Sequence, residues 1–177
     1  KKLKNFSGIE PVEPSPTFNT DLRDYQQHGL NWMNFLYNYG FGGILADDMG
    51  LGKTCQTISF IDKLKHEGNL NHPALIVVPT TLISNWKNEI NKFSPDLSVL
   101  ILYGPDRDKL YKTVKDHDIV ITTFSILSRD SNRHRKRQYT CLVVDEATNI
   151  KNPKTKMAKA VFQIKADFKL ALSGTPI

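Results

Sequence analysis

The sequence predicts an α/β fold in which a parallel β-sheet lies between two layers of helices, and three observations lead to this prediction. Short apolar segments recur along the chain, longer segments with helical spacing of apolar residues separate them, and a glycine-rich turn joins the first such pair. Strands that alternate with helices are joined by crossovers, which make the strands parallel and place helices on both faces. The chain has 177 residues, 40% of them apolar, which suffices for one domain with a buried core.

The first elements along the chain are an extended segment and a long helix. Residues 1–18 are basic and then proline-rich, so we expect an extended lead-in before a domain that covers residues 19–177. From Asp21 to Tyr39 the apolar spacing predicts a helix, and Gly40 is a usual stop for it. Six apolar segments then predict the strands: Gly43 to Ala46, Ala74 to Val78, Val99 to Leu102, Ile119 to Thr122, Leu142 to Val144 and Leu170 to Leu172.

The segment ILADDMGLGKT, which ends at Thr54, predicts a nucleotide-phosphate site after the first strand. Gly50 and Gly52 allow backbone dihedrals that side chains forbid, so that successive N–H groups can point at phosphate oxygens. Lys53 adds a cation for the β- and γ-phosphates, Thr54 offers a hydroxyl to Mg²⁺, and the next helix contributes its positive end. The strict pattern of such loops begins with glycine, and Asp47 stands there. The predicted nucleotide-binding residues of the loop are Asp48, Met49, Gly50, Leu51, Gly52, Lys53 and Thr54.

A second segment, CLVVDE from Cys141 to Glu146, predicts the other half of the same site. Its apolar strand brings Asp145 to the carboxyl edge of the sheet, where the carboxylate can hold the Mg²⁺ that Thr54 also coordinates. Glu146 then lies beside the γ-phosphate and is expected to orient and polarise the attacking water. Alone, this segment would be read as an acidic loop after a buried strand. Paired with the phosphate loop, it predicts Glu146, Lys53 and Asp145 as catalytic residues, Thr54 and Asp145 as metal ligands, and ATP and Mg²⁺ as cofactors.

Six motifs follow one another between Leu22 and Ile177: LRDYQQHGLNWM, DDMGLGKT, LIVVPTTLISNW, ITTFSIL, VVDEATNIKNP and LALSGTPI. In this order they resemble the Swi/Snf family of helicase-like ATPases. The residues of DMGLGKT, and of DEATNIKNP followed by a helix and SGTPI, are more similar to the bacterial members of that family than to DEAD-box or DEAH-box helicases.

The resemblance implies a three-layer α/β/α P-loop NTPase, the N-terminal RecA-like lobe of a two-lobe motor with ATP between the lobes. A second RecA-like lobe of the same protein would supply the arginines that complete the hydrolytic site. We therefore expect the chain to be an excised domain or the N-terminal part of a longer protein, and to be inactive as an isolated lobe.

The resemblance also implies an ATPase that translocates on duplex DNA and displaces or remodels bound proteins, without indicating which proteins. A strand-separating RNA or DNA helicase and a non-catalytic DNA-binding scaffold are the alternatives. A degenerate scaffold is expected to lose at least one of Lys53, Thr54, Asp145 and Glu146, and all of them are present.

Further residues receive roles from the resemblance alone. Gln26 matches the adenine-reading glutamine of the family, although Asp24 replaces a proline that is usual nearby. Thr148 stands where related motors have His or Gln, so we expect an altered contact to the SGT segment. Polar side chains after two of the predicted strands would contact the DNA backbone by analogy, or else cap helices. These candidate DNA contacts are Thr80, Thr81, Asn85, Trp86, Thr122 and Thr123.

The charge of the chain points toward a polyanionic partner. The net charge is +6, from 24 Lys and Arg against 18 Asp and Glu, although such a charge also serves solubility. A basic run from Ser128 to Tyr139 is expected to be a solvated loop, either a phosphate-binding patch or a mobile linker without a specific role. Its candidate DNA contacts are Arg133, Arg135, Lys136 and Arg137.

Other classes of protein receive no support from the sequence. Cys55 and Cys141 both fall in segments expected to be buried, which favours small core residues in a reducing compartment. The histidines lack the paired spacing of a zinc site. The apolar runs are too short for a bilayer, and no secretion or lipidation pattern is visible, so we expect a cytoplasmic protein without a membrane partner, associated with the nucleoid if it is bacterial.

Overall fold

A computed structural model describes residues 7–46 and 52–174 of the chain. None of the helices in these two ranges combines the length and the apolar character that crossing a bilayer requires. Both cysteines are buried and unpaired, as the sequence predicted. The predicted positions outside the described residues are Asp47, Asp48, Met49, Gly50, Leu51 and the end of the SGTPI motif from Thr175 onward.

All strands of the sheet run parallel, in the order β1-β6-β5-β2-β4-β3. Ala46 pairs with Ser173, and Val77 pairs with Val144, so neighbouring strands end level with one another. We call the side where the strands end the carboxyl edge, and the opposite side the amino edge. The strands are β1 (Gly43–Ala46), β2 (Ala74–Val78), β3 (Val99–Leu102), β4 (Ile119–Thr123), β5 (Gln138–Val144) and β6 (Lys165–Ser173).

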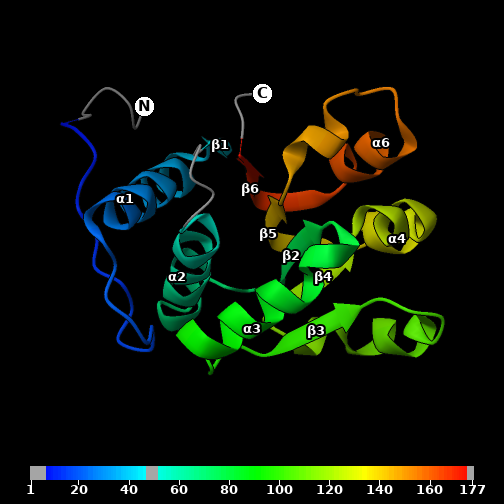
Figure 1. Cartoon of the computed structure of the whole chain (residues 1–177), viewed down its shortest axis with the longest axis horizontal. Helices are drawn as coiled ribbons and strands as arrows, with labels where there is room; N and C mark the ends of the chain where they lie inside the picture. The colour runs from blue at the N-terminus through cyan, green and yellow to red at the C-terminus, as the bar shows by residue number, and fades with distance from the viewer. Residues whose placement is uncertain (1–6, 47–51, 175–177) are drawn as a thin grey trace.

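Helices cover both faces of the sheet, which confirms the predicted three-layer α/β/α architecture. Figure 1 shows α1, α2 and α3 on one side of the strands and α4 and α6 on the other. Within β2, Ile76 and Val78 pack toward the first group of helices, and Leu75 and Val77 toward the second. A strand buried on both faces reads as an unbroken apolar run, which is why β2 was recognisable. The helices are α1 (Asp24–Tyr39), α2 (Lys53–His66), α3 (Ile83–Phe93), α4 (Phe124–Arg129), α5 (Ser131–Arg135) and α6 (Lys156–Phe162), with 3₁₀ segments η2 (Thr80–Leu82), η3 (Arg107–Asp116) and η4 (Ala147–Ile150).

Helix α1 begins later than the sequence predicted, at Asp24 rather than Asp21. The backbone of Arg23 is extended, and its N–H donates to Oε1 of Gln26 at 2.9 Å, which closes the first turn. Asp24 therefore enters the helix without the usual proline, and a carboxylate in the first turn suits the helix dipole. The helix ends at Gly40, whose φ of 77° is the left-handed conformation expected of a glycine stop.

Strand β6 is longer than the apolar segment that predicted it. Its first half alternates exposed Lys165, Asp167 and Lys169 with buried Phe168 and Leu170. A period of two is a strand signal when one face is partly open, and it was missed because only the apolar run was counted.

The N-terminal segment packs against the domain. Residues 7–18 contain no helix or strand, but the N–H of Val12 donates to Oδ1 of Asn31 at 2.9 Å. The Thr17 hydroxyl donates to the buried carboxylate of Asp62 at 2.7 Å. Phe18 belongs to the core itself. The described part of the lead-in is therefore anchored to α1 and α2.

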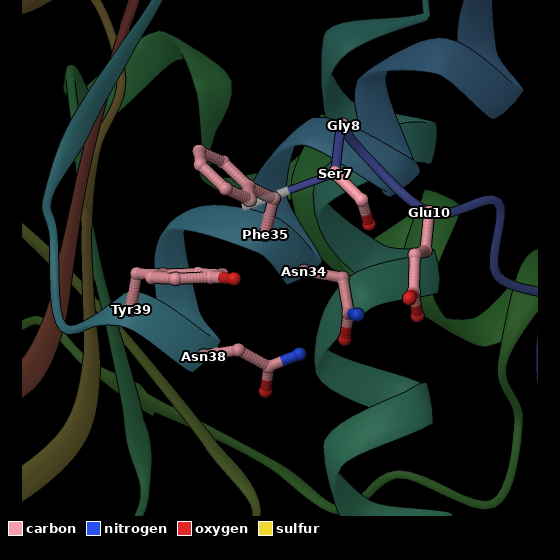
Figure 2. A pocket seen from close by; sticks show the side chains of 7 residues that line it. All are labelled: Ser7, Gly8, Glu10, Asn34, Phe35, Asn38 and Tyr39. Carbon is pink, nitrogen blue, oxygen red and sulfur yellow. The ribbon is translucent and has the colours of Figure 1, made fainter. Parts of the chain in front are cut away.

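A cavity of about 460 Å³ lies between this segment and the outer side of α1 (Figure 2). The sticks in Figure 2 show Glu10 from the segment opposite Asn34 and Asn38 from the helix. None of the predicted site residues lines this cavity. It is a consequence of how the segment crosses α1.

The prediction of a solvated loop between Ser128 and Tyr139 is wrong. The segment contains the end of α4 and all of α5, and His134 is fully buried. Its ring nitrogens lie 3.1 Å from the hydroxyl of Tyr111 and 2.7 Å from that of Tyr139. These tyrosines belong to η3 and β5. The prediction failed because the basic residues around His134 in the sequence do not indicate its contacts with aromatic residues of other elements.

Candidate nucleotide and nucleic-acid site

Lys53 and Thr54 open helix α2 at the carboxyl edge of the sheet. Gly52 precedes them with a φ of 95°, a conformation that glycine adopts without strain. The side chain of Lys53 is 7% exposed, and its Nζ atom lies 3.9 Å from the position that a Cβ would take on Gly174. Since Gly174 follows β6, the strand beside β1, the phosphate-loop lysine lies close to the end of β6.

Gln26 lies against the same end of the loop. A Cβ added to Gly52 would stand 2.8 Å from Nε2 of Gln26 and 3.0 Å from Cε2 of Tyr25, so glycine is needed there for space as well as for conformation. Gln26, Gly52, Thr54 and Asn85 line one cavity of about 670 Å³. Gln26, which is predicted to read the base, therefore shares with Gly52 and Thr54 of the phosphate loop a cavity of a size that suits a nucleotide.

Asp145 and Glu146 follow β5 at this edge. Oδ1 of Asp145 accepts the backbone N–H of Glu146 at 2.8 Å, and Oδ2 accepts the indole N–H of Trp86 at 2.8 Å. Glu146 has a φ of 54°, the single positive value for a non-glycine residue among those described. Such a conformation costs about 1–3 kcal/mol and is found mainly at functional sites. The side chain of Glu146 is exposed, so water has access to its carboxylate.

Glu89 is a residue of this site that the sequence reasoning missed. It lies on α3, lines the cavity shared by Gln26 and Thr54, and is half-buried. Burial raises the pKa of its carboxyl, and the charge of Asp145 raises it further against the opposing effect of Lys92. A possible signal was its spacing of three residues from Trp86, which places both on one side of a helix.

The side chains present are suited to magnesium carried by a nucleotide. In the described ranges, no three His, Cys, Asp or Glu side chains gather into a site that could hold a metal alone. Mg²⁺ is usually held by one or two protein oxygens together with phosphate oxygens and waters. Thr54 and Asp145 are donors of this kind, and bound MgATP would supply the phosphate oxygens and the metal charge.

Three of the candidate DNA contacts lie exposed at the carboxyl edge. Thr80 and Thr81 form η2 directly after β2, and Asn85 lies on the first turns of α3. Hydroxyl and amide groups at the start of a helix are typical contacts for a phosphate backbone. Nothing in their positions prevents such contacts.

Three other candidate contacts are enclosed, which corrects the prediction for their side chains. Trp86 is 0% exposed and donates to Asp145, as described above. Thr122 is also 0% exposed and donates its hydroxyl to the carbonyl of Leu102 at 2.9 Å. Thr123 is the N-cap of α4 and accepts the N–H of Ile126 at 3.2 Å. The helix-capping alternative is therefore confirmed for Thr123, whereas Thr122 neither caps a helix nor is exposed.

The basic residues of α5 lie at the opposite edge of the sheet from the nucleotide cavity. Helix α5 ends just before β5 begins, so it lies at the amino edge, whereas Asp145 lies beyond the end of β5. The side chains of Arg133, Arg135 and Lys136 are exposed there. These residues form a surface separate from Thr80 and Thr81.

The three arginines among the candidate DNA contacts of this segment all have partners. Arg133 pairs with Asp108 at 3.2 Å, and its guanidinium lies 4.5 Å from the ring centre of Tyr111. Arg137 is half-buried and donates to the carbonyl of Tyr111 at 2.9 Å. Arg135 donates to the neighbouring Asn132, which leaves both its charge and that of Lys136 at the surface.

Comparison with known proteins identifies a family for nearly the whole chain. The model of the SNF2-related domain family matches residues 25–177. YwqA of Bacillus subtilis, which bears the name of an ATP-dependent helicase/translocase, is 39% identical over 180 residues, which cover 100% of this chain and 20% of that protein. The human SWI/SNF-related matrix-associated actin-dependent regulator of chromatin subfamily A member 1 is 39% identical over 183 residues, which cover 100% of this chain and 18% of that protein.

Solved structures agree with this comparison. The SWI2/SNF2 ATPase core of Sulfolobus solfataricus in complex with dsDNA superposes with a TM-score of 0.88 at 42% identity. The match covers 94% of this chain and 34% of that one. A second structure, of the Sulfolobus solfataricus SWI2/SNF2 ATPase core domain, gives a TM-score of 0.85 at 42% identity, over 97% of this chain and 34% of that one. The chain thus spans only a part of the relatives that it matches.

Proposed function

Since this chain belongs to the SNF2-related family, whose N-terminal ATPase lobe it represents, we propose that it binds MgATP and that the whole protein hydrolyses ATP in response to duplex DNA. The observation that carries the proposal is the arrangement at the carboxyl edge. Gln26, Gly52 and Thr54 line one cavity, Lys53 faces Gly174 beside it, and Asp145 follows β5 at the same edge.

Each side chain has a distinct role in this proposal. Lys53 neutralises negative charge on the β- and γ-phosphates, and Thr54 and Asp145 hold the metal. Glu146 orients a water molecule toward the γ-phosphate and accepts its proton. Gln26 pairs with the edge of the adenine, because an amide both donates and accepts hydrogen bonds. The backbone of Asp48, Met49, Gly50 and Leu51 binds phosphate oxygens.

Duplex DNA is the proposed activator and track. The Sulfolobus core was solved with dsDNA, and Thr80, Thr81 and Asn85 are exposed at the edge that also carries the nucleotide cavity. We assign these residues to the track. Arg135 and Lys136, with Arg133 and Arg137 beside them, form an auxiliary phosphate-binding surface at the amino edge.

The proposed output is translocation along the duplex, which displaces or remodels proteins bound to it. A second RecA-like lobe of the same protein contributes arginines to the cleft and completes the hydrolytic site. ATP and DNA must both be present where the protein works, so we propose that it is cytoplasmic and, in a bacterium, associated with the nucleoid.

Nucleotide binding tests the first part of the proposal. Lys53→Ala should weaken MgATP binding by the chain, because it removes the cation at the phosphates. Lys65→Ala removes the same charge from the other end of α2, where Lys65 pairs with Asp118 at 2.7 Å, and should bind like the wild type. Equal affinity of all three proteins in a fluorescent-nucleotide titration would rule out Lys53 as a phosphate ligand and favour the scaffold alternative.

A further inference from the structure

Trp86 joins helix α3 to the proposed metal ligand. Its indole is fully buried, and its N–H donates to Oδ2 of Asp145 at 2.8 Å. The other oxygen, Oδ1, accepts the N–H of Glu146 at 2.8 Å. Two donors from different elements fix the plane of the carboxylate, and each oxygen keeps a lone pair for another partner.

The acceptor of the Trp86 indole N–H indicates a role beyond packing. A buried indole N–H requires a partner, and a carbonyl oxygen would satisfy it. Here the partner is a carboxylate at the edge of the nucleotide site, and a hydrogen bond to an ionised group is shorter and stronger than one between neutral groups. Groups that hold metal-binding side chains in place in this way tune the metal site without touching the metal.

Helix α3 also reaches the predicted DNA-facing turn. The segment η2, with exposed Thr80 and Thr81, runs directly into α3. Ile83 and Ile90, on either side of Trp86 along the helix, are buried in the same core cluster as the tryptophan. The helix is therefore packed against the core on both sides of the indole, and η2 is continuous with it.

We propose that Trp86 is a positioning residue that couples the DNA-facing turn η2 to the metal ligand Asp145. When DNA seats on η2, α3 and its indole hold the carboxylate in the orientation that binds Mg²⁺. This inference rests on the proposed function and deepens it, because it names the route by which DNA acts on the nucleotide site.

The first test is the magnesium dependence of nucleotide binding in the whole protein. Trp86→Phe keeps an aromatic ring in the core and removes the donor. It should raise the Mg²⁺ concentration needed for tight ATP binding by about tenfold, the lower end of the range for such partners, and leave metal-free ATP affinity unchanged. Trp32→Phe changes the other tryptophan, which is half-buried on α1, and should behave like the wild type. An unchanged Mg²⁺ dependence in a folded Trp86→Phe protein would overturn the inference.

The second test follows the Trp86 indole in the wild-type protein. The indole ¹H–¹⁵N resonance of Trp86, identified by its absence from the spectrum of Trp86→Phe, reports directly on the hydrogen bond to Asp145. If Trp86→Phe fails to fold, the spectrum of Trp86→Tyr, which also lacks the indole, identifies the resonance instead. The resonance should shift when Mg²⁺ is added to the nucleotide-bound protein and again when duplex DNA is added. A resonance that moves in Asp145→Asn but responds to neither Mg²⁺ nor DNA would overturn the coupling.

The two proposals fail in different ways. If the wild-type protein binds no MgATP, the proposed function fails. If the wild type binds MgATP normally and Lys53→Ala does not, while Trp86→Phe has wild-type Mg²⁺ dependence, only the coupling role of Trp86 fails.

Discussion

Glu146 donates its backbone N–H to Oδ1 of Asp145 at 2.8 Å while its own backbone holds a left-handed φ of 54°. The two carboxylates of the acidic motif are therefore given different surroundings. Asp145 is held by two donors, and Glu146 extends from a sharp turn with its side chain exposed. These different surroundings suit two different roles, Asp145 as a metal ligand and Glu146 as the residue that acts on water.

Glu146→Gln should leave MgATP binding nearly intact and slow steady-state hydrolysis by the whole protein about a hundredfold or more, since general base catalysis contributes roughly 10²–10⁴ in rate. The substitution preserves the length of the side chain and removes the base. Glu13→Gln, an exposed position in the N-terminal segment, provides the control for a lost carboxylate. Wild-type turnover by Glu146→Gln would remove Glu146 from the mechanism.

The basic surface at the amino edge should contribute affinity that is independent of DNA sequence. Arg135→Ala with Lys136→Ala removes two exposed charges without disturbing the contacts of Arg133 and Arg137 with Tyr111. Each lost phosphate contact should reduce the log-log salt slope of duplex binding by about 0.9. An unchanged slope in the double variant would mean that this surface does not bind DNA. The control, Lys65→Ala, should have the same slope as the wild type.

His134 makes the fold sensitive to mild acid. Burial lowers the pKa of its imidazole from the ordinary 6.5 to about 4, with Asp130 opposing the change and the charges of Arg137 and Arg133 adding to it. The unfolded chain therefore binds a proton that the folded chain excludes between these two values. Stability is full above about pH 6.5 and decreases as the pH falls toward 4.

Wild-type protein should lose about 1–2 kcal/mol of unfolding free energy between pH 6.5 and pH 5 through this residue, because one pKa unit corresponds to about 1.4 kcal/mol. His134→Gln keeps a polar side chain but cannot take up the proton. Its stability should be lower at pH 7.5 and should vary less across this window. Parallel pH profiles for both proteins in urea titrations would contradict the assignment.

The isolated 177-residue chain should hydrolyse ATP at near-background rate even with saturating DNA. It has Lys53, Thr54, Asp145 and Glu146, but by our proposal the arginines of a second lobe are missing. An arginine supplied to the transition state is worth roughly 10³–10⁵ in rate in comparable phosphoryl-transfer sites. Robust DNA-stimulated turnover that Lys53→Ala abolishes would mean that the site is complete within this chain or completed by self-association.

The sequence predicted the sheet and its layers because both depend on local patterns. Strand β2 is apolar throughout because both of its faces are buried. Gly40 marks the end of α1 because the residue after the helix adopts a left-handed backbone conformation, which glycine favours. The acidic motif was placed at the carboxyl edge by the same logic, since a residue that follows a parallel strand must lie at that edge.

What the sequence did not reveal depends on contacts between distant residues. The tryptophan at position 86 was read as a DNA contact because it follows a strand, and only the fold shows its N–H directed at Asp145. His134 looked solvated among arginines, and its burial depends on Tyr111 and Tyr139 from other elements. Arg135 precedes β5 and Thr80 follows β2, so the two lie at opposite edges of the sheet. The order of the predicted strands already implied this separation, but both residues were assigned to DNA without using it.

The most direct test of the account is the ATPase rate of the whole protein with duplex DNA, single-stranded DNA and RNA at equal nucleotide concentration, each measured beside Lys53→Ala. We expect duplex DNA to stimulate hydrolysis far more than the other two, and Lys53→Ala to abolish the stimulated rate. Equal or greater stimulation by single strands or RNA would favour a strand-separating helicase, and no stimulation by any nucleic acid in a protein that binds MgATP would contradict the DNA-dependent motor altogether.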